Sequence, residues 1–481
     1  MDETKAVRPP TVAGTFYPAD PTELEQTVRG YLANASAPQI KGEIFGIIAP
    51  HAGYVYSGQT AAYSYKQLIE KKYDVAVILA PNHIEDFSEI SIFQGLAYST
   101  PLGRVAIDTA FAQLLSENST PSAPIILSMH GHAWENMKRT EHSIEVQLPF
   151  LQIVQPELPI VPIVLGSQDH STINTLVTAI KSASEKSGKR VLIIASSDLS
   201  HYHKLSDAKY LDGLLIKEFS DFDYFGLDCK IAMQQIEACG YGAITGAMQV
   251  CEVFGATNCK LLHLATSADS EFSQDTNHVV GYFSGAIFKD NSSHVQKFTE
   301  FTPEEKKYLC GLAKAATEMT VAALSPDFEI RHDEKFHQVF PAFVTINKNG
   351  NLRGCIGHIV SSADINSEVI ETARMASTMD SRFGAIRPEE LTELTYEVTI
   401  LSQMQRIFDF SKIQIGKHGL YIRTKYNNGI LLPQVATEYG WNTEEFLKNA
   451  CRKAGLPENE FLKSTTEVYI FEAVIADEND K

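Results

Sequence analysis

The sequence predicts an α/β domain with a central sheet flanked by helices, followed by a smaller α+β domain. Three observations lead to this assignment. The chain has 481 residues, more than one hydrophobic core usually organises. Before about residue 290, short apolar runs alternate with amphipathic helical stretches, as in sheets covered by helices. After about residue 301, predicted strands and helices occur in blocks, as in α+β folds.

The predicted strands of the first domain are short runs of apolar, often β-branched residues. Such runs, without polar alternation, are typical of strands that are buried on both faces of a sheet. Helices are expected from Asp20, an acidic N-cap before Pro21, and over residues 143–154. The strands are expected at residues 45–49, 75–80, 160–165, 191–195, 261–265 and 278–288.

A polar segment separates the two predicted domains. Residues 289–301 (KDNSSHVQKFTEF) follow the last apolar run of the first domain. Immediately after them, Thr302, Pro303 and Glu305 form a capping box with proline at the first helical position. We therefore assign residues 1–290 to the first domain, 291–301 to a linker and 302–481 to the second domain.

The second domain begins with a predicted helix and a predicted hairpin. Asn349-Gly350, a pair typical of type I′ turns, separates strand-like residues 342–348 from residues 352–359. The remaining expected elements are a helix over 367–379, a strand over 394–401 and a second hairpin from 419–423 and 429–432.

Composition argues against several classes of protein. The formal net charge of -18 repels phosphate backbones and anionic lipids, so we expect no bulk nucleic-acid binding and no membrane association. Residues 1–10 lack an apolar signal segment and no later apolar run could span a bilayer, so we expect a cytoplasmic protein. Seven cysteines are too few for a disulfide framework in this length, so we expect reduced thiols.

Three of the predicted strands end in loops that hold a histidine. His51, His83 and His201 follow the first, second and fourth of these strands. In open α/β sheets ligands bind beyond the carboxyl ends of the strands, so we expect the three histidines to converge there. A loop histidine is also commonly a hydrogen-bonded or exposed residue, and spacing alone leaves that alternative open.

Several strings of the first domain resemble the Memo family. They are AGTFYP at 13–18, PHAGY at 50–54, PNH at 81–83, EHSIEVQLPF at 141–150, SSD at 196–198 and ACG at 238–240. The strings follow the family's order, and the resemblance covers essentially residues 5–288. It implies a fold similar to class III extradiol dioxygenases, in which two histidines and a glutamate hold non-haem iron.

The same resemblance implies a metal site at His51, His83 and Cys239. The histidines correspond to those of the dioxygenases, and Cys239 stands where that class has its carboxylate. Imidazole and thiolate together suit iron, copper or zinc. We expect one transition metal ion, with iron(II) favoured and copper or zinc as alternatives. Taken alone, Cys239 is equally a small buried thiol.

Candidate catalytic residues surround this expected metal site. His201 falls where the dioxygenases have an acid/base histidine, which implies proton transfer, and Asp198 could orient it. His142 and Glu145 lie one helical turn apart, where they could line the mouth of the site or support its ligands. A hydrogen-bonded pair at the start of a helix is the alternative for His142 and Glu145.

Residues 352–357 (LRGCIG) resemble the hallmark string of AMMECR-type domains, and this resemblance runs from about 300 to 476. Arg353 and Cys355 share one face of the predicted strand. If their side chains meet, Arg353 lowers the pKa of the thiol and makes it reactive; otherwise Cys355 is a small buried residue. A polar pocket around them would be completed by Asp380, Arg382 and His418, which could instead form surface ion pairs.

These features favour a metal-dependent oxidoreductase that acts on an unidentified small-molecule or macromolecular substrate. Both domains resemble components of a system that also contains a radical SAM protein, which implies a modification pathway with that partner. The alternative is a non-catalytic metal-binding or scaffold protein whose second domain binds a partner. A third interpretation makes Cys355 the nucleophile of a thiol-dependent transferase or hydrolase.

Overall fold

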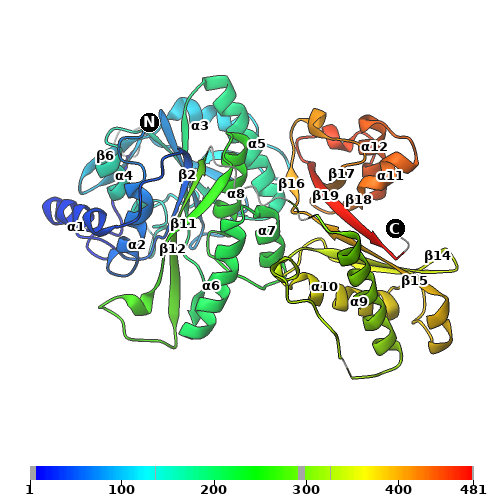
Figure 1. Ribbon diagram of the computed structural model, residues 1–481. Helices are drawn as coiled ribbons and strands as arrows, with labels where there is room; N and C mark the ends of the chain where they lie inside the picture. The colour runs from blue at the N-terminus through cyan, green and yellow to red at the C-terminus, as the bar shows by residue number, and fades with distance from the viewer. Residues whose placement is uncertain (1–6, 136, 291–297, 299, 326, 479–481) are drawn as a thin grey trace. The chain divides into compact units, whose positions relative to one another are not determined.

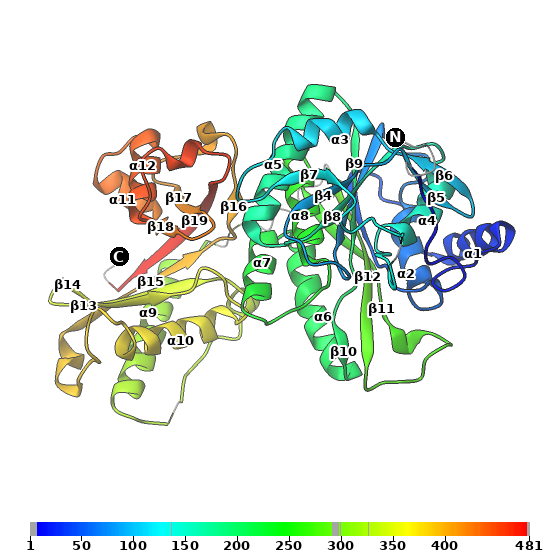
Figure 2. The same cartoon turned by 180° about the vertical axis from the view of Figure 1, so that it is seen from behind.

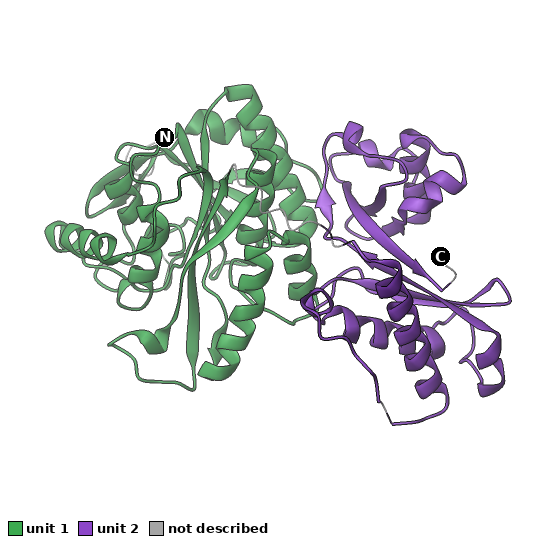
Figure 3. Ribbon diagram, in the orientation of Figure 1, with its two compact units in different colours: residues 1–295 green, residues 296–481 purple. Residues whose placement is uncertain are grey.

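The computed structural model describes residues 7–135, 137–290, 298, 300–325 and 327–478. The chain forms two compact units, unit 1 over residues 1–295 and unit 2 over residues 296–481 (Figure 3). Most of the predicted linker, 291–301, lies outside the described residues, so the division at 290 and 302 stays a prediction. Phe298 and Phe301, at its end, pack with the hydrophobic core of unit 2.

Unit 1 contains a mixed sheet of nine described strands. In spatial order they are β10 (His201–His203), β12 (Val279–Lys289), β2 (Glu43–Ala49), β9 (Val191–Ser196), β3 (Val75–Pro81), β8 (Ile160–Leu165), β4 (Ile90–Phe93) and β7 (Ile125–Ser128), with β11 (Asn258–Thr266) paired to β12. The inner strands β2, β9, β3 and β8 are parallel, whereas β12 and β4 pair antiparallel with their inner neighbours. All six predicted apolar runs form strands, since apolar runs of this length favour sheet. The expectation of a buried strand is wrong for residues 261–265, because among the described strands β11 pairs only with β12 and its side chains there are partly or fully exposed.

Helices cover both faces of this sheet (Figures 1 and 2). They are α1 (Pro21–Asn34), α2 (Tyr54–Lys66), α3 (Thr109–Ser116), α4 (Leu148–Val154), α5 (His170–Ser187), α6 (Leu205–Ser220), α7 (Tyr224–Ala232) and α8 (Tyr241–Val253). On one face α2 contacts β2 and β12, and α1 and α4 pack against α2. On the other face α8 contacts β2, β3 and β9, with α5 and α7 beside it.

The helix expected over residues 143–154 is shorter than predicted. A 3-10 turn, Glu145–Gln147, precedes α4, and α4 itself begins at Leu148. Pro149 lies in the first turn of α4, where its missing N–H costs nothing. A separate small sheet forms from β1 (Val7–Arg8), β5 (Ala97–Thr100) and β6 (Gly103–Ala106).

The parallel inner strands bring chemically active loops to one edge of the sheet. β2, β3 and β9 run in the same direction, so their carboxyl ends lie together. His51 follows β2, His83 follows β3, and Asp198 follows β9. The topology therefore accounts for the expected meeting of His51 and His83. The third histidine of their group is His142, whereas His201, which was expected there, begins β10 and is not part of the group.

Unit 2 is an α+β structure on a second, antiparallel sheet. Its strands, in spatial order, are β14 (Asn351–Gly357), β13 (Ala342–Lys348), β15 (Leu394–Leu401), β19 (Glu467–Asp477), β17 (His418–Arg423) and β18 (Asn428–Leu431), with β16 (Gln405–Arg406) on β19. Asn349 and Gly350 have φ values of 51° and 77°, the positive values that a type I′ turn requires. The predicted hairpin between β13 and β14 is confirmed.

Two groups of helices give unit 2 two hydrophobic cores. α9 (Pro303–Val321) and α10 (Ile365–Thr378) pack on β13 and β15, and α11 (Pro433–Glu438) and α12 (Thr443–Lys453) pack on β17 and β18. Thr302 and Glu305 form the predicted capping box at the start of α9. Over the described residues of both units, no helix combines the length and hydrophobicity needed to cross a membrane.

Candidate metal centre

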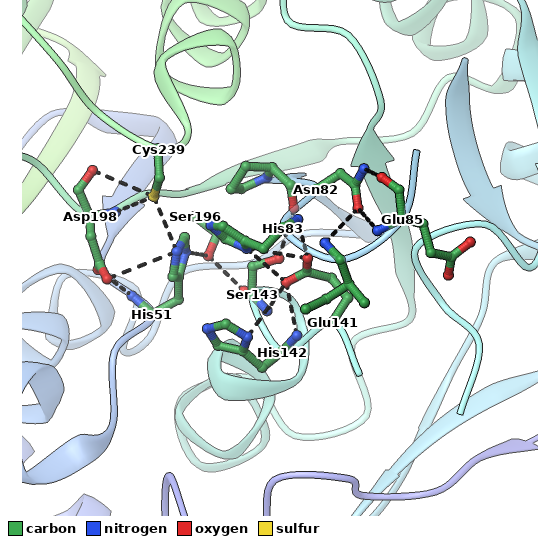
Figure 4. Close-up of polar contacts among 12 residues, drawn as sticks. His51, Asn82, His83, Glu85, Glu141, His142, Ser143, Ser196, Asp198 and Cys239 are labelled. Atoms are coloured by element: carbon green, nitrogen blue, oxygen red, sulfur yellow. Dashed lines mark hydrogen bonds and ion pairs between the residues drawn. The ribbon is translucent and has the colours of Figure 1, made fainter. Parts of the chain in front are cut away.

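His51 is buried at the end of β2, and a chain of hydrogen bonds fixes its tautomer (Figure 4). The Ser196 hydroxyl donates its single proton to the carbonyl of Ser143, at 2.6 Å, and accepts from Gln147 Nε2, at 2.8 Å. His51 Nδ1 lies 2.9 Å from the same oxygen, so His51 must be the donor in this contact. The lone pair of His51 is therefore on Nε2.

His83 follows β3 and is held by the carboxylate of Glu141. Its Nδ1 lies 3.1 and 3.2 Å from the two carboxylate oxygens, and its backbone N–H donates to the same group at 2.7 Å. Burial alone would raise the pKa of Glu141, but the hydrogen bond and charge of His83 hold it well below its usual range. The ionised carboxylate can only accept, so the neutral form of His83 carries its proton on Nδ1 and its lone pair on Nε2.

Cys239 lies just before α8, with its sulfur 3.2 Å from His51 Nε2. The backbone N–H of Asp198 donates to the same sulfur at 3.2 Å. Burial, with the charge of Asp198 second, raises the pKa of Cys239 above its ordinary value. A bound cation would reverse this preference, because metals bind the thiolate form. The sulfur and the lone pair of His51 thus face a common point.

His142 completes a triangle of imidazoles with His51 and His83. The ring centroids are 5.2 to 5.6 Å apart, and one ring nitrogen of each histidine lies within 4.8 Å of the other two. Phe16 packs against His142 at 4.5 Å, and no side-chain hydrogen bond to His142 occurs among the described residues. Three converging nitrogens, two with lone pairs fixed by their neighbours, are a donor set that can bind a transition metal ion.

The protonation of these histidines follows from burial and from their partners. Burial, and then the charges of His83 and His142, lowers the pKa of His51 well below its ordinary value. Burial also lowers the pKa of His142. For His83, burial opposes the charged form, but the hydrogen bond and charge of Glu141 outweigh it and raise the pKa. His51 and His142 are thus neutral near pH 7, the form that binds metal.

The structure places Asp198 against His51. Its Oδ1 accepts from the backbone N–H of His51 at 2.8 Å, and its Oδ2 lies 3.9 Å from His51 Nε2. Burial raises the pKa of Asp198 to about 7. His201 is half-buried, and its backbone N–H donates to Glu237 at 2.7 Å. Burial lowers the pKa of His201, and its charge in turn is felt by His51.

Glu145 lies in a separate hydrogen-bond network that involves the N-terminal segment. Its carboxylate pairs with Arg8 at 2.6 Å and accepts from the hydroxyl of Tyr17 at 2.7 Å. The backbone N–H groups of Thr11 and Val12 donate to it as well. Arg8 and Glu145 are both about 1% exposed, so this network is closed. Glu145 therefore ties the N-terminal segment to the unit, while its predicted companion His142 lies with His51 and His83.

Two supporting residues were not singled out from the sequence. Glu141 lies in the EHS string beside His142, and Ser196, the last residue of β9, begins the SSD string. Metal-binding histidines generally donate their second N–H to a carboxylate or another acceptor. A search for acceptors next to the candidate histidines would have drawn attention to Glu141.

In unit 2, the Arg353 side chain binds Glu390 and not the thiol of Cys355. Its guanidinium donates to both oxygens of Glu390, at 3.1 and 3.0 Å, and to the carbonyls of Gly384 and Ala385. The hydrogen bond from Arg353 lowers the pKa of Glu390 to about 2. Cys355 instead has its sulfur 3.3 Å from the Thr345 hydroxyl, which donates to it.

Asp380 and Arg382 do lie beside Cys355, but they bind its backbone. Asp380 accepts from the N–H of Cys355 at 2.8 Å, and Arg382 donates to its carbonyl at 3.0 Å. Because β14 is the edge strand of its sheet, these bonds occupy polar groups that a further strand would otherwise pair with. His418 lies in β17, separated from β14 by β13, β15 and β19 in the sheet.

Two family models match the chain, one within each of its two units. A family model described as Memo-like protein matches residues 8–286. The chain belongs to the Memo-like family. A second model, described as AMMECR1, matches residues 310–476. The Memo-like unit thus carries the histidine cluster, and the AMMECR1 match includes β14 with Cys355.

Relatives of the Memo-like unit are found among archaea. The MEMO1 family protein of Methanobrevibacter smithii is 38% identical over 294 residues, 59% of this chain and 100% of that protein. The MEMO1 family protein of Nitrosopumilus maritimus is 35% identical over 286 residues, 58% of this chain and 98% of that protein. Among solved structures, the uncharacterized protein PH0010 of Pyrococcus horikoshii is 33% identical to this chain. That match covers 36% of this chain, a shorter stretch than the Memo-like unit, and 92% of that chain, with a TM-score of 0.34.

Proposed function

We propose that the Memo-like unit is a metal-dependent redox enzyme component that uses one iron(II) ion held by His51, His83 and Cys239. The observation that carries this proposal is the convergence of one ring nitrogen each of His51, His83 and His142, within 4.8 Å of one another. The Cys239 sulfur lies beside this group, 3.2 Å from His51 Nε2. Two imidazoles and a thiolate form a donor set for a redox-active transition metal. When bound, the metal would act as a Lewis acid and one-electron centre for the substrate or for oxygen.

The surrounding side chains support this chemistry without taking part in binding the metal. His201 is half-buried and neutral near pH 7, so it can accept a proton from a substrate held in the site. Asp198 holds the backbone of His51 and keeps its own carboxyl close to Nε2. His51 is buried and Cys239 is partly buried, which limits the access of water to these donors.

The alternative is a non-catalytic metal-binding or scaffold protein, and one observation favours it. His142 lies with His51 and His83, so that it would be a fourth ligand beside Cys239. A site closed by four protein ligands is typical of structural metal, whereas three ligands leave a position for substrate. Copper or zinc in place of iron would also support this alternative.

The number of protein ligands can be tested on the iron-loaded protein. The full chain is purified without oxygen, its metals are measured by elemental analysis, and nitric oxide is added to the iron(II) form. Binding of nitric oxide, seen by electron paramagnetic resonance, would show an exchangeable position and support the enzyme. Bound zinc or copper, or iron that does not bind nitric oxide, would favour the non-catalytic function.

A change at Cys239 tests the relation to the two-histidine, one-carboxylate enzymes. Cys239→Glu replaces the thiolate by the carboxylate that the related dioxygenases use. We expect this variant to bind iron(II) and to keep or gain reactivity with oxygen, measured as oxygen consumption. Loss of iron(II) binding in Cys239→Glu would argue against a shared coordination plan.

We also propose that the protein acts in the cytoplasm, in a modification pathway with a radical SAM protein. The support is the presence of a Memo-like and an AMMECR1 domain in one chain. The full chain, used as bait in an anaerobic extract of its source, should retain an iron–sulfur protein of that class. If neither the full chain as purified nor the iron-loaded chain retains such a protein, the proposed partner is wrong.

A further inference from the structure

We propose that Glu141 is the positioning residue of the metal centre: it fixes His83 as the Nδ1–H tautomer and holds His142 beside it, so that the donor set is formed before a metal arrives. The proposal deepens the metal-binding function proposed above and rests on it. Glu141 would not touch the metal or the substrate. It would act through the two histidines.

The carboxylate of Glu141 contacts His83 and the backbone of the two residues that follow Glu141. Its carboxylate accepts from the backbone and Nδ1 of His83, and from the backbone N–H groups of His142, at 2.8 Å, and Ser143, at 3.0 Å. Glu141 is 4% exposed. One buried carboxylate therefore sets the orientation of the His83 ring and the path of the chain at His142 (Figure 4).

The support of His51 differs from the support of His83. His51 Nδ1 meets the neutral hydroxyl of Ser196, whereas His83 Nδ1 meets an ionised carboxylate. Hydrogen bonds to a charged acceptor are roughly twice as strong as those between neutral groups, and a carboxylate raises the basicity of the imidazole. Loss of Glu141 should therefore weaken metal binding more than loss of the Ser196 hydroxyl.

The backbone of Glu141 is itself anchored. Arg8 donates from Nη2 to the Glu141 carbonyl at 2.6 Å and from Nη1 to Glu145 at 2.6 Å. Arg8 is 1% exposed and also donates to the carbonyl of His132. This anchor leaves Glu141 little freedom to move away from His83. A carboxylate whose backbone is anchored in this way can hold a metal-binding histidine in place before the metal binds.

The test uses Glu141→Gln in the full chain, with cobalt(II) as the probe. The amide keeps the shape of the side chain but places a donor where one acceptor oxygen stood, against N–H groups that need acceptors. We expect cobalt(II) affinity, measured by competition with a chromophoric chelator, to fall roughly 10- to 100-fold, as for other supporting residues of metal ligands. Ser196→Ala should lose less, and Glu141→Asp should lie between wild type and Glu141→Gln.

A matched control separates positioning from stability. Glu218 is another buried carboxylate, paired with Lys230 at 2.5 Å on α6 and α7. Glu218→Gln should lower Tm, as Glu141→Gln does, but leave cobalt(II) affinity within about twofold at temperatures where both variants are folded. An equal loss of affinity in Glu218→Gln would make the effect one of general destabilisation and overturn the proposal.

The tautomer of His83 gives a measurement that needs no metal. Nitrogen-15 NMR of the metal-free chain, recorded at a pH at which the His83 ring is neutral, should show its proton on Nδ1, and Glu141→Gln or Glu141→Asp should populate the Nε2–H form. An unchanged tautomer together with unchanged affinity overturns the proposal. If the wild-type chain binds no cobalt(II), the metal function fails, yet the His83 tautomer still decides the role of Glu141.

Discussion

The two motif-bearing regions of the chain differ in what their polar side chains face. In unit 1, His51, His83 and His142 bring one ring nitrogen each within 4.8 Å of the others, and the Cys239 sulfur lies 3.2 Å from His51 Nε2. In unit 2, Asp380 and Arg382 lie beside Cys355 but bind its backbone. Charged groups near a thiol are therefore not always groups that act on it. The first region is arranged as a donor set, and the second as the protected edge of a sheet.

The first test of this difference removes one charged group from each region and compares the loss of stability. Glu145→Gln opens the closed network around Arg8 and should destabilise unit 1 by about 3–5 kcal/mol, as expected when one partner of a buried pair is lost. Arg382→Gln removes a guanidinium that is 54% exposed, so it should cost unit 2 at most about 1 kcal/mol. Urea denaturation followed by hydrogen exchange in each unit measures both values. Similar costs in the two variants would show that the networks do not differ in this way.

A second test compares the metal donors with the group proposed to move protons. Cys239→Ser replaces a charged soft ligand by a neutral hydroxyl, so metal affinity should fall by more than the roughly 100-fold expected for a supporting residue. His201→Ala should change affinity less than about tenfold, because His201 lies outside the proposed ligands. Equilibrium dialysis of iron(II) without oxygen measures both. Unchanged binding in Cys239→Ser with lost binding in His201→Ala would require a site built on His201.

Asp212 tests whether every buried carboxylate of unit 1 is stabilising. Asp212 accepts from the backbone N–H of Ser200, but its Oδ2 has no hydrogen-bond partner among the described residues. Burial raises the pKa of Asp212 to about 6, so the folded state holds a proton that the unfolded state releases near pH 4. Stability is therefore lost as pH rises from about 4 to 6, by up to about 3 kcal/mol.

Asp212→Asn removes that loss. Near pH 4 the variant and the wild type should have similar free energies of unfolding. At pH 7 the variant should be more stable by about 1–3 kcal/mol, measured by urea denaturation at both pH values. This is the opposite of the effect expected for Glu145→Gln. A destabilised Asp212→Asn at pH 7 would mean that the ionised carboxylate has a favourable partner.

The smallest expected effect concerns the thiol of unit 2. Cys355 is partly exposed, whereas Cys251 is fully buried and burial raises the pKa of its thiol. Cys355 should therefore react faster with iodoacetamide than Cys251. Because Arg353 binds Glu390, Arg353→Gln should change the Cys355 rate by less than about twofold. Mass spectrometry measures the rate of alkylation at each cysteine. If Cys355 reacts several-fold more slowly in Arg353→Gln, Arg353 does influence the thiol as predicted from the sequence.

The sequence predicts the strands and the meeting of His51 and His83 because both follow from local patterns, but it names His201 as the third histidine where the structure has His142. Apolar runs mark the buried strands, and residues after parallel strands share one edge of the sheet. The support of His83 cannot be obtained in this way, since Glu141 lies 58 residues away and is brought close only by folding. Likewise, alternation places Arg353 and Cys355 on one face, but the orientation of the Arg353 side chain is decided by Glu390. Spacing places residues on a face; hydrogen-bond partners decide where they point.

Strand β12 has a consequence for the synthesis of the protein. It pairs with β2, so that Gly285 lies opposite Ile48, and the loop of His51 follows directly after β2. At ordinary translation speeds the roughly 240 residues between these strands take about 10 to 50 s to make. Over that interval β2 lacks its antiparallel neighbour, and its edge is available to other chains or to chaperones. The metal centre is therefore expected to mature only after the last strand of unit 1 has left the ribosome.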